Sequence, residues 1–248
     1  MHILGDIGNT DTKLCLVSTK HKIIKKITFP SKNLNQKKLS KYFSLLKPNY
    51  KKVNKILFCS VVPKSFNLIK KFISKKTEIN CYEVKNLNLK SLIKIKVNYK
   101  QVGSDRITNA ISLINDKDNF IILDFGTATT FDVLTKDTYS GGIIAPGIRL
   151  SLDTLSNKAT LIPKINLKMI KNVIGNDTVS AVRSGFFWGY AGLIDNIIKL
   201  IKKETRKSFK VIITGGFSNL FKKSINTKVY HNKDITINGL IKISKLIK

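Results

Sequence analysis

Residues 123–132 read LDFGTATTFD and continue an apolar run that begins at residue 120, near the middle of this 248-residue chain. The run predicts a buried strand, and Gly126 permits a tight turn in which backbone N–H groups can face an anion. Carboxylates bracket this turn, and hydroxyls follow the glycine, at Asp124, Asp132, Thr127, Thr129 and Thr130. A phosphate group and its counter-cation need such a set of groups at the end of a strand. The alternative is an ordinary β-hairpin with threonines in its second strand.

The N-terminus carries nearly the same pattern. Residues 6–13 read DIGNTDTK and lie between predicted strands at residues 1–7 and 14–17. Asp-x-Gly therefore occurs twice, at Asp6 and at Asp124, each time in a predicted hairpin. Because a domain commonly holds about 100–200 residues, this spacing suggests two similar domains that face each other across a cleft.

A third glycine element lies at residues 211–218, VIITGGFS, where an apolar strand runs into a glycine pair. It can be a simple turn or a helix end. With two phosphate hairpins in the chain, we favour a place where backbone packs closely on a flat ligand such as a nucleoside.

Residues 103–106 read GSDR and open a helix predicted for residues 107–114. Asp105 in the first turn is either a capping carboxylate or a base that accepts a proton from a substrate hydroxyl. Arg106 can hold a substrate carboxylate through its guanidinium fork.

The longest predicted helix covers residues 177–201 and has Thr178 at its start, as a possible N-cap or a ligand contact. Gly185, Gly189 and Gly192 lie inside this helix, and each costs about 1 kcal/mol of helix propensity relative to Ala. Close helix–helix approach, within the chain or across a dimer, would offset that cost. Periodicity also predicts strands at residues 22–29, 55–62 and 81–84 and helices at residues 39–46, 65–74 and 238–248.

These blocks, together with residues 141–147, 174–178 and 184–189, resemble the type III pantothenate kinase family of the acetate and sugar kinase/Hsp70/actin superfamily. The resemblance implies an α/β fold of two ribonuclease H-like domains, mixed sheets flanked by helices, facing each other across a nucleotide cleft. Domain 1–117 would carry the first phosphate hairpin and the substrate block. Domain 118–248 would carry the second hairpin and the glycine pair.

The resemblance also implies the reaction and its residues. The reaction is ATP-dependent phosphorylation of pantothenate to 4'-phosphopantothenate, the first step of coenzyme A biosynthesis. The implied ATP contacts are Asp6, Ile7, Gly8, Asn9, Thr10, Asp11, Thr12, Lys13 and Thr127. The implied pantothenate contacts are Gly103, Ser104, Asp105, Arg106 and Thr178, with Asp105 as the general base. Asp124 matches a monovalent-cation position for K⁺ or NH₄⁺, Mg²⁺ accompanies ATP, and the family forms homodimers.

Two departures from the family pattern concern the substrate block. Ser104 stands where the family more often has Ala, a small change that we expect to preserve activity. The family also places an upstream Tyr near an Asn-Pro pair, whereas residues 98–101 read NYKQ and lack the Pro, so Tyr99 is not assigned to the site.

The formal charge is +30, and 41 of the 45 basic residues are lysines dispersed along the chain. Specific nucleic-acid recognition favours Arg, so we interpret the charge as a global bias rather than one binding face. No apolar run reaches the roughly 18 residues of a membrane span, and no export leader is evident, which predicts a cytoplasmic protein. Scattered Cys and His residues indicate neither disulfides nor a zinc site.

Two rival functions remain open. A related sugar or small-molecule kinase would act on a sugar and not on pantothenate. A non-catalytic regulatory relative could bind nucleic acid through the positive charge. The block at residues 103–106 argues against the first, and the set Asp6, Asp105, Asp124 and Thr127 argues against the second.

Overall fold

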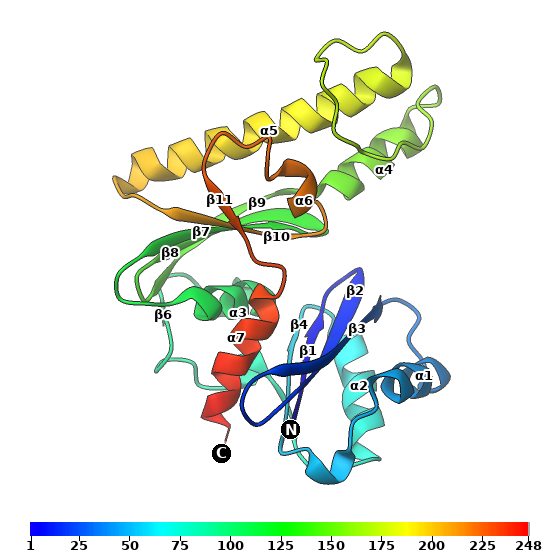
Figure 1. Cartoon of the computed structure of the whole chain (residues 1–248), viewed down its shortest axis with the longest axis vertical. Helices are drawn as coiled ribbons and strands as arrows, with labels where there is room; N and C mark the ends of the chain where they lie inside the picture. Colours follow the sequence, from blue (N-terminus) through cyan, green and yellow to red (C-terminus); the bar gives the residue numbers. More distant parts are fainter. Residues whose placement is uncertain (248) are drawn as a thin grey trace. The chain divides into compact units, whose positions relative to one another are not determined.

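The computed structural model describes residues 1–247, and its contacts divide the chain into two compact units (Figure 1). Unit 1 comprises Met1–Ile114, Asp137–Tyr139 and Asp234–Lys248, and unit 2 comprises Asn115–Lys136 and Ser140–Lys233. Each unit is described by itself below.

Unit 1 is built on a five-stranded mixed sheet in the order β3-β2-β1-β4-β5. Its strands are β1 (His2–Ile7), β2 (Asp11–Val17), β3 (Ile23–Pro30), β4 (Lys55–Ser60) and β5 (Cys81–Glu83). β1 and β2 form an antiparallel hairpin, while β4 runs parallel to both β1 and β5. The first predicted phosphate hairpin is thus confirmed as a hairpin at the centre of a sheet.

Helices cover both faces of this sheet. α1 (Gln36–Leu46) and α2 (Pro63–Ser74) pack on one face through a buried apolar cluster that includes Ile3, Leu14, Phe43, Phe58 and Phe72. α3 (Ser104–Leu113) and α7 (Ile235–Ile243) contact each other and the strands β4 and β1. Short elements complete the unit: η1 (Tyr50–Lys52), η2 (Val84–Asn86), β6 (Lys94–Ile95), η3 (Tyr99–Gln101) and η4 (Ser244–Leu246).

Unit 2 repeats the strand order of unit 1. Its strands are β7 (Asn119–Phe125), β8 (Ala128–Thr135), β9 (Thr138–Pro146), β10 (Lys210–Gly215) and β11 (Val229–His231), in the order β11-β10-β7-β8-β9. β7 and β8 form an antiparallel hairpin, and β10 runs parallel to both β7 and β11. The first two residues of β9 belong to unit 1, where they pair with β6.

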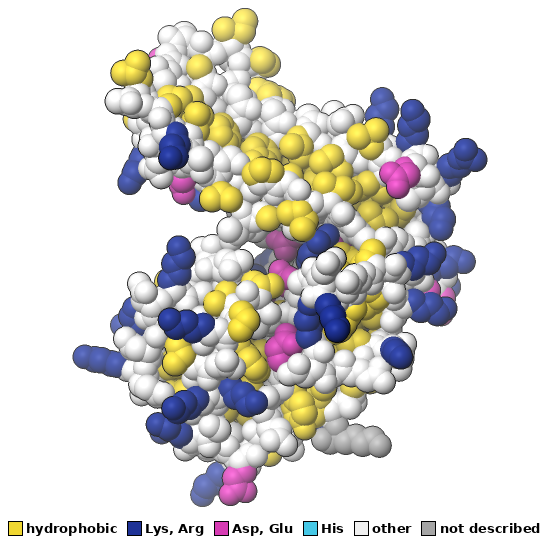
Figure 2. Space-filling model, turned by 180° about the vertical axis from the view of Figure 1, so that it is seen from behind, with side chains coloured by type: hydrophobic (Ala, Val, Ile, Leu, Met, Phe, Trp, Pro, Cys, Tyr) yellow, Lys and Arg dark blue, Asp and Glu magenta, His cyan; other side chains and the backbone are white. Residues whose placement is uncertain are grey.

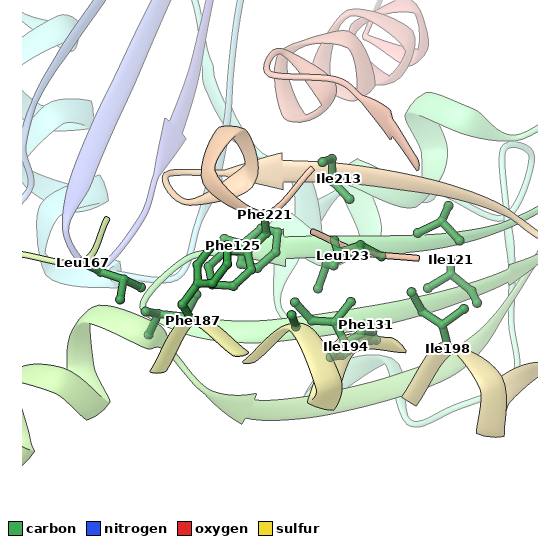
Figure 3. Packing of buried hydrophobic residues seen from close by; sticks show 14 of the residues in the cluster. Ile121, Leu123, Phe125, Phe131, Leu167, Phe187, Ile194, Ile198, Ile213 and Phe221 are labelled. Carbon is green, nitrogen blue, oxygen red and sulfur yellow. The ribbon is translucent and has the colours of Figure 1, made fainter. Parts of the chain in front are cut away.

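The core of unit 2 lies between its sheet and the long helix α5 (Thr178–Thr205). Alternate residues of β7 and β8 point toward α5, α4 (Ile148–Lys158) and α6 (Ser218–Phe221) (Figure 3). Phe221 stacks on Phe125 at 5.5 Å and on Phe187 at 5.4 Å between ring centroids. Such aromatic pairs add about 0.5–1.5 kcal/mol beyond their burial. They anchor the end of β7, where the second hairpin turns.

Most strands and helices predicted by periodicity lie where expected, with boundaries moved by a few residues. The helix predicted for residues 238–248 is shorter, because α7 ends at Ile243 and a 3-10 turn follows, and residue 248 lies outside the described residues. The domain ranges 1–117 and 118–248 stay predictions. The compact units differ from them in the boundary after Ile114 and in the assignment of Asp137–Tyr139 to unit 1. They also differ at the end of the chain, because α7 packs against α3 and β1 and belongs to unit 1.

Candidate active site

Asp6 is the partly buried carboxylate at the first hairpin turn, with 14% of its side chain exposed. It is the penultimate residue of β1, opposite Lys13 on β2 and beside Cys59 on β4. The Lys13 ammonium lies 3.6 Å from Asp6 Oδ2, and the Cys59 thiol donates to Asp6 Oδ1 at 3.5 Å. Burial raises the pKa of the Asp6 carboxyl, and the Lys13 charge opposes that rise. A carboxylate and an ammonium therefore point from adjacent strands at one end of the sheet.

The turn itself exposes Asn9, Thr10 and Asp11. The Gly8 amide does not face outward for an anion, because it donates to the Asp11 carbonyl at 3.0 Å and closes the turn. The Gly8 amide is used within the turn, and the implied contact of Gly8 with ATP stays a prediction.

Ile7 and Thr12 differ from the other ATP contacts expected in residues 6–13. Both side chains are fully buried, and the Thr12 hydroxyl bonds with Ser31 Oγ at 2.8 Å. On β2, Thr12 shares the inner face with Leu14 because side chains alternate along a strand. Thr12 supports the hairpin from inside, and a ligand would meet the backbone of Ile7 rather than its side chain.

Residues 103–106 begin helix α3 as predicted. The N-cap is Gly103, and Asp105 in the first turn accepts a hydrogen bond from the Arg106 amide at 2.8 Å. A Cβ atom at Gly103 would lie 2.3 Å from Asp105 Oδ1, so glycine is required for this side chain to fold back over the helix start. Backbone amides of Arg106 and of Asp105 itself lie against this carboxylate, whose two oxygens keep acceptor capacity for a substrate hydroxyl.

Unit 1 brings the hairpin and the helix start together. The charge of Asp105 raises the pKa of Asp6, which places the two carboxylates within electrostatic reach. Burial also raises the pKa of Asp105, and the Arg106 amide and guanidinium oppose the rise. Two buried carboxylates with raised pKa values are typical of a site that handles protons or cations.

Sequence reasoning missed Glu83, at the end of β5. Its carboxylate accepts from the Lys85 amide at 2.7 Å and from the Ser60 amide at 3.4 Å. Next to it, the Lys85 ammonium lies 5.5 Å from the centre of the Tyr99 ring. The Tyr99 hydroxyl is buried and makes no hydrogen bond within residues 1–247, and the Glu83 charge adds to the burial that raises its pKa. No motif marks Glu83 in the sequence.

The second hairpin lies in unit 2. Asp124 is the penultimate residue of β7 and pairs with Thr130 on β8 and with Thr214 on β10. Gly126 and Thr127 are exposed in the turn, and the Gly126 amide donates to the Ala128 carbonyl at 3.0 Å. This hairpin therefore closes as the first one does.

Thr129, one of the hydroxyls expected near a phosphate, does not face outward. Its side chain is 0% exposed, on the α5 side of β8 with Phe131 and Val133. The expectation is wrong for Thr129, because strand alternation directs it into the core.

Gly215 packs on the hairpin itself. Its φ of +87° favours glycine, and a Cβ there would lie 2.5 Å from the Phe125 carbonyl oxygen and 2.6 Å from Asp124 Oδ1. The Gly216 amide donates to the same Phe125 carbonyl at 3.0 Å. The sequence predicted that the backbone at this glycine pair packs closely on a nucleoside. In the structure, the backbone of Gly215 packs closely on strand β7 instead, and the Asp124 carboxylate lies next to it.

Gly147, at the start of α4, also packs on this turn. A Cβ there would lie 2.0 Å from the Thr127 carbonyl oxygen. Glycines from two further elements therefore hold the second hairpin in place.

Thr178 is the first residue of α5 and is exposed. The N-cap is Asp177, which forms a capping box with Ser180. The alternative of Thr178 as N-cap is therefore wrong, and its hydroxyl is not needed for that purpose.

Comparisons with known proteins agree with one another. The family described as type III pantothenate kinase matches residues 2–200. The chain belongs to the type III pantothenate kinase family. A type III pantothenate kinase from Pelagibacter ubique (strain HTCC1062) is 66% identical over 248 residues, which is 100% of both chains. One from Sulfurihydrogenibium sp. (strain YO3AOP1) is 33% identical over 254 residues, covering 99% of this chain and 100% of the relative.

Solved structures at low identity add the fold alone. A Sinorhizobium meliloti protein assigned as a 2-dehydro-3-deoxygalactonokinase matches with a TM-score of 0.63 at 8% identity, covering 100% of this chain and 99% of the other. The predicted mixed α/β fold with two helix-flanked sheets is confirmed for this type III pantothenate kinase family member. Within residues 1–247, no helix has both the length and the apolar character needed to cross a bilayer.

Proposed function

We propose that the chain transfers the γ-phosphoryl group of ATP to the primary alcohol of pantothenate, the first step of coenzyme A biosynthesis. The observation that carries this proposal is the pairing, within unit 1, of the Asp6–Lys13 hairpin with the Asp105–Arg106 helix start in a member of this family. Phosphoryl transfer needs positioning and charge neutralisation more than covalent chemistry, and these groups supply both.

Asp105 is the general base in this proposal. Its raised pKa brings it closer to the pH at which it must accept the proton of the pantothenate hydroxyl. Arg106, with Gly103 and Ser104, would hold pantothenate, and the guanidinium suits a carboxylate because it offers paired N–H donors. Thr178 would add a hydroxyl contact.

The first hairpin would hold the ATP phosphates. Lys13 supplies a positive charge, and the exposed Asn9, Thr10 and Asp11 lie in the turn beside it. The backbone of Ile7, Gly8 and Thr12 shapes this turn. Mg²⁺ would bridge phosphate oxygens with few protein ligands, and Asp6 would orient it or its water.

In unit 2, Thr127 would contact ATP and Asp124 would bind K⁺ or NH₄⁺. The residues fit a large monovalent cation in one respect: Gly215 leaves open the space next to Asp124 Oδ1 that a Cβ would fill. Carboxylate and carbonyl oxygens are the donors that hard cations take. No three His, Cys, Asp or Glu side chains gather as a metal group among residues 1–247, so the cation would need backbone or ligand oxygens.

The direct test is ADP release with ATP, Mg²⁺ and pantothenate, with and without K⁺. Asp105→Ala should slow turnover at least about a hundredfold, the scale of a lost general base, while ATP still binds. Asp118→Ala, which removes an exposed carboxylate paired with Lys210, is the matched control and should keep the full rate. Near-normal turnover of Asp105→Ala would remove it from the role.

Two further arms address the rival functions. Activity with hexoses and none with pantothenate would favour a sugar kinase. Affinity for DNA or RNA that falls steeply with salt would favour a nucleic-acid binder. On the face shown in Figure 2, Lys and Arg side chains are spread over the surface rather than gathered in one patch. We expect neither activity. Because ATP is the donor, we place the reaction in the cytoplasm.

We also propose that the chain is a homodimer that uses the exposed face of α5. Cβ atoms at Gly185 and Gly189 would meet no described atom within 4 Å beyond their own stretch of helix, so no packing against other described parts of the chain offsets their cost. Both glycines line an apolar groove of about 440 Å³, together with Phe186, Tyr190, Leu193, Val182, Leu155, Ser151 and Pro146. Hydrophobic side chains are visible over the helical part of unit 2 (Figure 2).

Sedimentation tests this assignment. Gly189→Leu should weaken self-association, because a bulky side chain would fill the groove. Gly192→Ala, on the same helix but outside the groove lining, should leave it unchanged. A monomeric wild type, or a Gly189→Leu variant that dimerises normally, would contradict the assignment.

A further inference from the structure

The end of β4 and the start of α3 are joined by side-chain hydrogen bonds to backbone. The Ser60 amide donates to Ser104 Oγ at 2.8 Å, and Ser104 Oγ donates to the Ser60 carbonyl at 3.0 Å. Ser104 is 1% exposed, so water does not compete for these bonds. This reciprocal pair fixes the strand end against the helix start.

Glu83 completes this junction from a third element. Its carboxylate accepts from the Ser60 and Lys85 amides and also interacts with the Ser104 hydroxyl. An ionised carboxylate is an acceptor only, so it can accept from both amides; the Ser60 amide is shared with Ser104 Oγ, whose own hydrogen goes to the Ser60 carbonyl. An amide side chain would turn an NH₂ group toward one of these donors.

The junction connects to both groups of the proposed chemistry. Cys59 precedes Ser60, is the parallel partner of Asp6 and donates its thiol hydrogen to it. Asp105 follows Ser104 in the first turn of α3. Any shift of Ser60 relative to Ser104 therefore changes the separation of Asp6 and Asp105.

We propose that Glu83 is a positioning residue that sets the separation of Asp6 and Asp105 through the Ser60–Ser104 junction. The inference rests on the proposed function, in which Asp6 serves the phosphates and their metal and Asp105 the substrate hydroxyl. It assigns to Glu83 no contact with either substrate.

The first test is Glu83→Gln in the full-length enzyme at saturating ATP and pantothenate. We expect kcat to fall about tenfold or more, since small misplacements of reacting groups have effects of that order or larger, while the KM for ATP stays near the wild-type value.

The matched control is Asn35→Ala. The Asn35 side chain also caps a backbone amide of unit 1, that of Lys38 at 2.9 Å, but at the start of α1. It should lower the melting temperature and leave kcat unchanged. Wild-type kcat in Glu83→Gln would overturn the proposal.

The second test separates positioning from general stability. In an Asp105→Ala background, adding Glu83→Gln should not change the residual rate, because the group that Glu83 positions is gone. A further loss as large as in the wild-type background would overturn the proposal. Near-normal turnover of Asp105→Ala alone would overturn the base assignment and this inference with it. A slow Asp105→Ala beside a fully active Glu83→Gln would overturn the inference only.

Discussion

Asp6 and Asp124 occupy the same position in two sheets of the same strand order. Each is the penultimate residue of a strand that forms an antiparallel hairpin with the next strand and pairs in parallel with a later strand, β4 in one sheet and β10 in the other. Their neighbours differ: Asp6 has Lys13 and Cys59, whereas Asp124 has Thr130 and Thr214. An ammonium beside one carboxylate suits phosphate, and hydroxyls beside the other suit a cation, in line with the roles proposed for them.

Turnover should depend on pH through Asp105. A base must be deprotonated, and burial raises the pKa of Asp105 above its ordinary value of 3.8. We therefore expect kcat to fall as pH decreases, with an apparent pKa above 3.8 that belongs to the interacting Asp6–Asp105 pair. A kcat profile from pH 4 to 9 measures it. The residual rate of Asp105→Asn should lack this acid limb, and an identical limb in the variant would contradict the prediction.

Lys13→Met should raise the KM for ATP about tenfold. The change removes a charge-assisted contact to phosphate and leaves the buried Asp6 carboxylate without its 3.6 Å partner. Steady-state kinetics at varied ATP measures the effect. Lys25→Met removes the same charge from an exposed position of β3 and should change nothing. Equal effects in the two variants would mean that only the overall positive field matters.

Gly215→Ala should destabilise unit 2 by about 2 kcal/mol or more, because φ is positive there and the new methyl group would meet the Phe125 carbonyl. Trp188, the single tryptophan of the chain, lies on α5 and reports unfolding of unit 2 by fluorescence in urea. At Gly216 a Cβ would lie 4.0 Å from the same carbonyl, an ordinary contact, so Gly216→Ala should be tolerated. Similar urea midpoints for the two variants would refute the argument.

Stability should fall as pH decreases from about 6.5 to about 4 because of His2. Burial, assisted by the charges of the N-terminal ammonium, Lys55 and His21, lowers the pKa of His2 to about 4. Between that value and the ordinary 6.5, the unfolded chain binds a proton that the folded chain does not, so acid favours unfolding. Thermal melts by circular dichroism test this. His2→Gln should flatten the dependence in that window more than His21→Gln, which changes the exposed member of the ring pair.

The features that were predicted correctly from the sequence are those that depend on residues close together along the chain. The two hairpins, the long helix α5 and the block at residues 103–106 depend on periodicity, glycine and short-range spacing. The buried positions of the Thr12 and Thr129 side chains also follow from strand alternation, with Leu14 in one case and Phe131 in the other.

Glu83 could not be found from sequence in the same way. Glu83 reaches the Ser60–Ser104 junction only because β5 pairs with β4 in the folded sheet. The two serines that it contacts are 44 residues apart along the chain, so no local pattern connects them. The identical strand order of the two units was also hidden, since strand order depends on non-local pairing that no sequence pattern near the strands records.

The return of α7 to α3 and β1 has a consequence for biosynthesis on the ribosome. All residues of unit 2 leave the exit tunnel before α7 does, although β1 was translated first. Unit 1 therefore cannot be completed until all of unit 2 has been synthesised. A stop codon ahead of α7 would therefore damage the portion that carries Asp6 and Asp105, although both are translated long before it.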